Sequence, residues 1–187
     1  MALTPSTMLP LGTPAPDFAL PEPLSGETVA RDAVRGSAGL LVMFICNHCP
    51  YVKHIRDELV RLGNDALARG VGVVAISAND ADHYPEDAPE RMAEEARRYA
   101  YPFRYLHDAE QDVAHAYQAA CTPDFYLFDR ELKLYYRGRL DGATPGNEAP
   151  NDGADLRAAL SGMLAGATPP EPQQPSMGCN IKWRPAA

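Results

Sequence analysis

The feature that most constrains the fold is an apolar segment that ends at two closely spaced cysteines. Residues 39–45 are continuously apolar, which is typical of a β-strand covered on both faces. Directly after them, positions 46–50 read Cys-Asn-His-Cys-Pro, and beyond this point apolar residues recur with a helical period. We therefore expect a buried strand that leads straight into a helix, with both cysteines near the helix N-terminus.

The rest of the chain alternates between strand-like and helix-like patterns. Asp87 and Glu90 have the spacing of a capping box, which predicts that Asp87 caps the helix that follows. The order of the segments is that of an α/β sandwich with a mixed sheet. The expected strands are 16–20, 27–31, 39–45, 71–77, 103–107, 124–128 and 132–140, and the expected helices are 49–62, 87–99, 110–120 and 155–164.

The length and the proline distribution predict one domain followed by a tail. The 187 residues are 45% hydrophobic, which is enough for one soluble domain with its own core. We assign residues 1–167 to this domain, including an extended arm over 1–38, and residues 168–187 to a proline-rich tail. The tail ends in a turn-like Gly-Cys-Asn-Ile-Lys-Trp segment, and we expect Ile181 and Trp183 to dock it onto the domain.

Charge and hydropathy limit the partners of the chain. The net charge of −8 argues against a nucleic-acid partner or an anionic membrane partner. The first 38 residues have no early basic residue and no unbroken apolar segment, so no secretory signal is expected. The longest apolar run has eight residues, far short of the roughly 20 that span a membrane. We expect a cytoplasmic, reducing location, where paired thiols are usually catalytic or metal-binding.

Two thiols at a helix N-terminus favour nucleophilic chemistry. The unpaired N–H groups and the helix dipole stabilise an anion there, so the pKa of such a thiol falls and its reactive thiolate becomes populated. We expect Cys46 to be the more exposed sulfur and to attack, with Cys49 as the resolving residue. Asn47 and His48 lie between them, and a protonated His48 would further favour the Cys46 thiolate.

Two other interpretations of the pair remain open. The two cysteines could be buried thiols without a role, or they could bind a metal together with His48 and His54. A closed structural site usually draws four ligands from two separated pairs, and the chain has no second Cys-x-x-Cys. We therefore expect neither a metal nor a cofactor. The alternative is a metal-binding protein that uses thiolate and imidazole ligands, which analysis of the metal content would detect.

A second motif, Cys121-Thr122-Pro123, precedes the strand expected at 124–128. A strand, Cys-x-x-Cys, a helix and then Thr-Pro before a hairpin together resemble the thioredoxin superfamily. The resemblance implies a thioredoxin-like fold, with a central mixed sheet flanked by helices, an N-terminal hairpin extension and a C-terminal tail. It also implies that Pro123 is the cis-proline of that superfamily, and that the backbone of Thr122 pairs with a bound disulfide substrate.

The N-terminal arm narrows the resemblance. Residues 15–20 with Gly26 and Val29 are similar to the opening of the redoxin, or AhpC/TSA (peroxiredoxin-like), branch. The Cys-x-His-Cys-Pro site and the Gly-Cys-x-Ile-Lys-Trp ending are similar to a subgroup of these redoxins. This resemblance implies a thiol–disulfide oxidoreductase that serves cell redox homeostasis. Its partners would be protein or small-molecule disulfides and a thiol electron donor, and the protein would be a monomer or a weak homodimer.

An antioxidant peroxide reductase is the alternative enzyme within this resemblance. Peroxiredoxins carry Pro-x-x-x-Thr-x-x-Cys; Cys49 and Pro50 fit the end of that pattern, whereas Cys46 replaces the threonine and Val42 the proline. By that alignment Cys49 would attack and Cys46 would resolve, the reverse of the roles above. Cys121 and Cys179 are candidates for extra redox roles, against the plainer interpretation that they are small buried residues.

Overall fold

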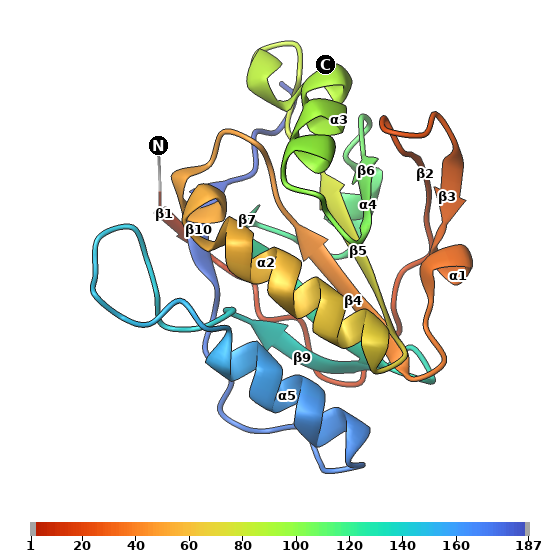
Figure 1. Ribbon diagram of the computed structural model, residues 1–187, viewed down its shortest axis with the longest axis vertical. Helices are drawn as coiled ribbons and strands as arrows, with labels where there is room; N and C mark the ends of the chain where they lie inside the picture. Colours follow the sequence, from red (N-terminus) through yellow and green to blue (C-terminus); the bar gives the residue numbers. More distant parts are fainter. Residues whose placement is uncertain (1–2, 186–187) are drawn as a thin grey trace.

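The computed structural model describes residues 3–185 and has a five-stranded central sheet in the order β6-β5-β4-β8-β9 (Figure 1). Strand β4 is parallel to β5, and β5 is parallel to β6, whereas β8 is antiparallel to both β4 and β9. The predicted mixed sheet is therefore confirmed. The strands are β4 (Gly39–Phe44), β5 (Val71–Ser77), β6 (Arg104–His107), β8 (Asp124–Asp129) and β9 (Leu134–Gly138).

Both faces of this sheet are covered, which explains the uninterrupted apolar sequence of β4. Helices α2 (Pro50–Ala68) and α5 (Ala154–Leu164) contribute to the apolar cluster on one face, which Leu41 and Met43 of β4 join. On the other face, Leu40 and Val42 join a cluster with α4 (Asp112–Ala116) and the N-terminal segment. Successive residues of a strand point to opposite faces, so a strand covered on both sides must be apolar throughout.

The N-terminal arm contributes a short hairpin, as expected, although its strands are shorter than predicted. In this hairpin β2 (Ala19–Pro21) pairs antiparallel with β3 (Thr28–Ala30). The connecting turn contains Gly26 at φ +77°, a left-handed conformation that glycine adopts without a steric penalty. The remaining helical elements are α1 (Arg31–Val34), the short 3₁₀ helix η1 (Pro85–Asp87) and α3 (Pro89–Arg98).

A second, three-stranded sheet brings the two terminal regions together beside the start of α2 (Figure 1). It consists of β1 (Leu3–Pro5), β10 (Met177–Asn180) and β7 (Cys121–Thr122), with β10 in the middle and both pairings antiparallel. The sequence predicted no strand in these three segments and a turn-like structure over part of β10, so the prediction was wrong there. These strands are two to four residues long and exist through pairing with distant segments, which local periodicity cannot reveal.

The tail does not project from the domain within the described residues. After β10, Ile181 is 1% exposed and lies in the cluster formed with α4 and the N-terminal segment. Residues 1–2 and 186–187, the outer ends of the two predicted parts, lie outside the described residues. Among residues 3–185, none of the helices combines the length and the apolar character needed to cross a membrane.

Candidate active site

The junction between β4 and α2 places Cys49, rather than Cys46, at the tip of the helix. Strand β4 ends at Phe44, and α2 begins at Pro50 with Cys49 as its N-cap. Proline suits the first helical position because the N–H that it lacks would have no partner within the helix. Cys46 and Cys49 are 1% and 0% exposed. The expectation that Cys46 is the exposed sulfur at the helix tip was therefore wrong.

Thr122 faces both cysteines from the opposite side. The Sγ atom of Cys46 lies 3.4 Å from the Thr122 hydroxyl, and the Sγ atom of Cys49 lies 3.2 Å from the Thr122 carbonyl oxygen. The peptide bond between Thr122 and Pro123 is cis. The structure thus brings together Cys46, Cys49 and the Thr-Pro segment, which are 73 to 76 residues apart in the sequence.

The two remaining cysteines occupy different environments. Cys179 pairs in register with Thr122, and its Sγ atom lies 3.0 Å from the Sγ atom of Cys49. Cys121 is also buried, but its thiol is directed to the carbonyl oxygen of Pro123 at 3.6 Å. Burial raises the pKa of Cys121, which keeps it in the unreactive thiol form. Cys179 therefore belongs to the sulfur cluster, whereas Cys121 lies behind it.

The electrostatics of the cluster single out Cys49 as the ionised sulfur. A hydrogen bond from the Cys46 thiol lowers the pKa of Cys49 most strongly; bonds from the Cys179 thiol and the Val52 amide add to this and outweigh the effect of burial. The same hydrogen bond raises the pKa of Cys46, and burial and the charge of Asp87 raise it further. Cys46 therefore acts as a donor to the Cys49 thiolate.

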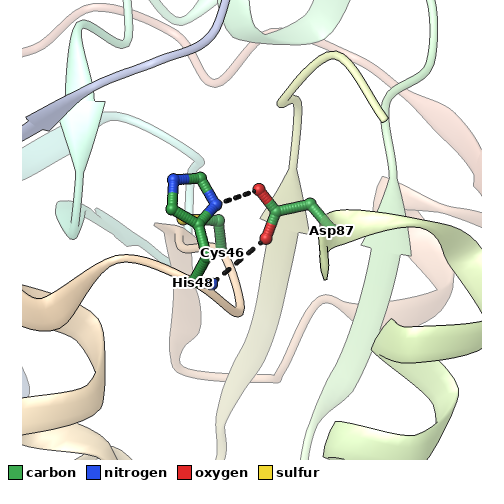
Figure 2. Close-up of side chains that lie close together, drawn as sticks. All are labelled: Cys46, His48 and Asp87. Atoms are coloured by element: carbon green, nitrogen blue, oxygen red, sulfur yellow. Dashed lines mark hydrogen bonds and ion pairs between the residues drawn. The ribbon is translucent and has the colours of Figure 1, made fainter. Parts of the chain in front are cut away.

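Asp87 organises the loop between the two cysteines, and the sequence analysis misassigned it. Its carboxylate accepts hydrogen bonds from the backbone N–H groups of Asn47 (2.8 Å) and His48 (3.3 Å). It also accepts a bond from Nδ1 of His48 at 2.6 Å (Figure 2). The side-chain amide of Asn79 donates to the same carboxylate at 2.8 Å. Helix α3 instead has Ala88 as its N-cap, without a side-chain capping bond. The prediction that Asp87 caps this helix was wrong.

The ion pair between His48 and Asp87 changes the expected role of the histidine. The hydrogen bond to Asp87 raises the pKa of His48 despite its partial burial, so the imidazolium form is favoured. Its positive charge is matched by the buried Asp87 carboxylate at 2.6 Å, and that carboxylate raises the pKa of Cys46. The expectation that His48 favours a Cys46 thiolate is therefore not met.

Asn47 fixes the same loop from its other side. Its side-chain amide donates to the carbonyl oxygen of Glu86 at 2.9 Å, and its side-chain oxygen accepts a bond from the hydroxyl of Tyr105 at 3.1 Å. Both side chains that hold the loop, those of Asn47 and Asp87, are buried. The loop between the cysteines is therefore tied to η1 and β6 and has little freedom to move on its own.

A metal-binding arrangement is present only in part. Within residues 3–185, one group of three side chains, Cys46, His48 and Asp87, has ligand atoms within 4.8 Å of one another (Figure 2). His54, which the sequence also suggested, is not in this group. The Nδ1 atom of His48 is already bound to the Asp87 carboxylate at 2.6 Å. This donor set is better explained as an ion pair that holds the loop.

Comparison with known proteins assigns the family. The model of the AhpC/TSA family matches residues 11–137, more than half of the 187 residues, including both cysteines of the pair and the Thr-Pro segment. The chain belongs to the AhpC/TSA family. The match to the family model ends before β10, so Cys179 lies outside the part of the chain that this model describes. No curated protein matches the chain.

Solved structures agree with the fold. A crystal structure of an uncharacterized conserved protein from Geobacillus kaustophilus has 53% identity and a TM-score of 0.98, covering 100% of this chain and 99% of that chain. A hypothetical protein, SMc02350 from Sinorhizobium meliloti, has 48% identity and a TM-score of 0.95 over 98% and 100% of the two chains. The thioredoxin domain of a thiol-disulfide oxidoreductase from Bacteroides vulgatus has 17% identity and a TM-score of 0.61 over 81% and 99%. The expected thioredoxin-like fold is thus confirmed.

Proposed function

We propose that the protein is a thiol–disulfide oxidoreductase in which Cys49 attacks and Cys46 resolves. One observation carries this proposal: Cys49 is the N-cap residue of α2, a hydrogen bond from the Cys46 thiol lowers its pKa, and its sulfur lies 3.2 Å from the Thr122 carbonyl oxygen. A thiolate at a helix N-terminus is the nucleophile that disulfide exchange requires. Membership of the AhpC/TSA family and the fold shared with a thiol-disulfide oxidoreductase domain support the same chemistry.

The reaction proceeds through a mixed disulfide. The Cys49 thiolate attacks one sulfur of a substrate disulfide, and the other substrate sulfur leaves as a thiolate. Cys46 then attacks Cys49, the bond between Cys49 and the substrate breaks, and the proton of Cys46 goes to the departing thiolate. The product is a Cys46–Cys49 disulfide and a reduced substrate, and an external thiol donor returns the enzyme to the dithiol form. Protein and small-molecule disulfides are the proposed substrates.

Peroxide reduction is the second candidate, favoured by the family and by the low pKa of Cys49. Here the Cys49 thiolate attacks a peroxide oxygen and becomes a sulfenic acid, while the other oxygen leaves with a proton as water or an alcohol. Cys46 then condenses with the sulfenic acid to form the same disulfide and releases water. Consumption of peroxide with dithiothreitol as donor distinguishes this activity from exchange.

Single cysteine variants test the assignment. Reduced wild type, Cys46→Ser, Cys49→Ser and the control Cys121→Ser are treated with oxidised glutathione, and adducts are located by peptide mass spectrometry. We expect Cys46→Ser to react at Cys49, Cys49→Ser to be inert, and Cys121→Ser to form the Cys46–Cys49 disulfide as wild type does. An adduct on Cys46 in Cys49→Ser would reverse the roles, and inertness of the wild type toward both disulfides and peroxide would remove the proposal.

A further inference from the structure

Outside the pair of Cys46 and Cys49, the sulfur that lies beside Cys49 belongs to Cys179 in the tail. Cys179 is 130 residues from Cys49 in the sequence, yet their Sγ atoms are 3.0 Å apart. A disulfide bond needs a separation of about 2.05 Å, so a movement of about 1 Å would join them. Cys49 therefore has two thiol neighbours, Cys46 and Cys179.

The position of Cys179 is fixed by its strand. Its register partner in β7 is Thr122, the residue whose carbonyl oxygen faces Cys49. The neighbouring Gly178 packs so closely that a Cβ atom there would lie 2.0 Å from the same carbonyl oxygen. Cys179 therefore approaches Cys49 along a strand whose backbone is in direct contact with the active-site segment.

The residues after the strand hold it in place. Ile181 is buried in the core, and the backbone N–H of Lys182 donates to the side chain of Asn79 at 2.8 Å. The backbone N–H of Asp80 donates to the carbonyl oxygen of Lys182 at 2.9 Å. Cys179 is thus held from both ends of its strand and does not lie on a loose terminus.

We propose that Cys179 is a third redox residue that competes with Cys46 for Cys49. The proposal rests on the disulfide chemistry of Cys49 and extends it. When Cys49 carries a mixed disulfide, the Cys179 sulfur attacks Cys49, a Cys49–Cys179 bond forms, and the substrate leaves as a thiolate that takes up the proton of Cys179. When Cys46 and Cys49 are joined, the same attack releases Cys46 as a thiol. The second step only exchanges one disulfide for another, so it needs no oxidant or reductant.

The electrostatics give Cys179 a different role in the reduced and in the oxidised protein. Burial, together with the hydrogen bond to Cys49 and the Cys49 charge, raises the pKa of Cys179 to about 12 in the reduced protein. Cys179 is then a thiol that stabilises the Cys49 thiolate. Once Cys49 enters a disulfide, its negative charge no longer raises the pKa of Cys179, although burial, the largest cause, still does. The same residue therefore first supports the nucleophile and then releases the product.

The bond to Cys179 has a structural consequence that the bond to Cys46 does not have. A Cys46–Cys49 disulfide closes a small ring within one loop. A Cys49–Cys179 disulfide joins the N-terminus of α2 to β10 and thereby fastens the tail covalently across the active site.

Variants that lack Cys46 isolate this step. Cys46→Ser and the double variant Cys46→Ser/Cys179→Ser are treated with oxidised glutathione, quenched with acid, alkylated and mapped. We expect a Cys49–Cys179 disulfide in the single variant and a persistent glutathione adduct on Cys49 in the double variant. Because a neighbouring thiol acts at a high effective concentration, loss of the adduct should be at least about tenfold faster in the single variant. Cys46→Ser/Cys121→Ser is the matched control and should behave as Cys46→Ser does.

The outcomes separate this proposal from the proposed function. A persistent Cys49 adduct in Cys46→Ser, with Cys179 alkylated and far-ultraviolet circular dichroism unchanged, would overturn the role of Cys179. It would leave the Cys46–Cys49 chemistry intact. Failure of Cys49 to react in any variant would instead remove the proposed function itself.

Discussion

Asp87 shows how one buried side chain can set the shape and charge of a reactive loop. It accepts two backbone N–H groups of the loop between the cysteines and pairs with the imidazole of His48. The sequence placed it before a helix, where a capping role was the local interpretation. The contact with Asn47 spans 40 residues, and no local pattern indicates it. The paired cysteines themselves could be predicted because strand, motif and helix are adjacent in the sequence.

Replacing Asp87 with asparagine should lower the pKa of His48 and change the pH dependence of stability. The pKa of His48 is raised in the folded protein, so the ion pair stabilises the fold fully below the unfolded-state pKa of roughly 6.5. This stabilisation is lost as the pH rises through the raised pKa. For Asp87, burial raises the pKa, but hydrogen bonds outweigh burial and the pKa is lowered overall. The stabilisation from Asp87 is therefore present above the unfolded-state pKa of roughly 3.9 and is lost as the pH falls through the lowered pKa.

The stability difference between wild type and Asp87→Asn should thus be greatest between about pH 4 and about pH 6.5, measured by urea unfolding. Asp57→Asn, which removes the same charge from an exposed position of α2, is the control. A difference that stays constant from acid to alkaline pH would contradict the ion pair.

The ionised state of Cys49 should be visible without any substrate. The ultraviolet absorbance of a thiolate should persist in the reduced wild type well below the ordinary cysteine pKa of roughly 8.5, because hydrogen bonds from the neighbouring thiols lower the pKa of Cys49. Cys49→Ser should lose this absorbance, and Cys121→Ser should keep it. Retention of the signal in Cys49→Ser would place the charge on another sulfur.

At the level of elements, the sequence predicted those parts whose apolar pattern is local. Strands β4 and β5 and helix α2 follow from continuous apolar segments and a helical period. Strands β7 and β10 are different, because their residues become strands only by pairing with segments that are distant in the sequence. For the same reason the place of Cys179 beside Cys49 could not be predicted, although both residues were recognised as redox candidates.

Gly178→Ala should disturb the alignment of β10 with β7. A Cβ atom at this position would lie 2.0 Å from the Thr122 carbonyl oxygen, so the strand must shift. Overpacking of this kind costs about 1–3 kcal/mol of unfolding free energy. In the Cys46→Ser background the same change should slow formation of the Cys49–Cys179 disulfide. Gly146→Ala is the matched control, because a Cβ atom there meets nothing within 4 Å. Equal rates in both variants would show that the strand alignment is unimportant.

At the level of the whole molecule, the segment after residue 167 takes part in the fold. It supplies the middle strand of the small sheet and a buried residue, Ile181, of the core. The apolar residues of the tail indicated docking from the sequence, but not that the tail would form a strand beside Cys46 and Cys49. The small sheet therefore joins the tail to the N-terminal region and to the active site at once.

Truncation after Ala167 should lower the melting temperature, and an unchanged value would contradict docking. Since a truncated chain can fail to fold, Ile181→Ala offers a finer measurement: loss of a fully buried isoleucine side chain costs about 2–5 kcal/mol. Met177→Ala, at a 38% exposed position in the adjoining strand, should cost far less. Urea unfolding of the two variants gives the loss of unfolding free energy in each. Equal losses would show that Ile181 does not anchor the tail.

The 130-residue separation of Cys49 and Cys179 also determines when the sulfur cluster is completed during synthesis. The ribosome releases the cysteine pair long before it releases β10, so a growing chain carries both reactive sulfurs without the strand that later shields them. A stalled or shortened chain would keep them uncovered, open to oxidation and to cross-linking with other nascent proteins. The two sulfurs are thus shielded only after β10 has also been synthesised.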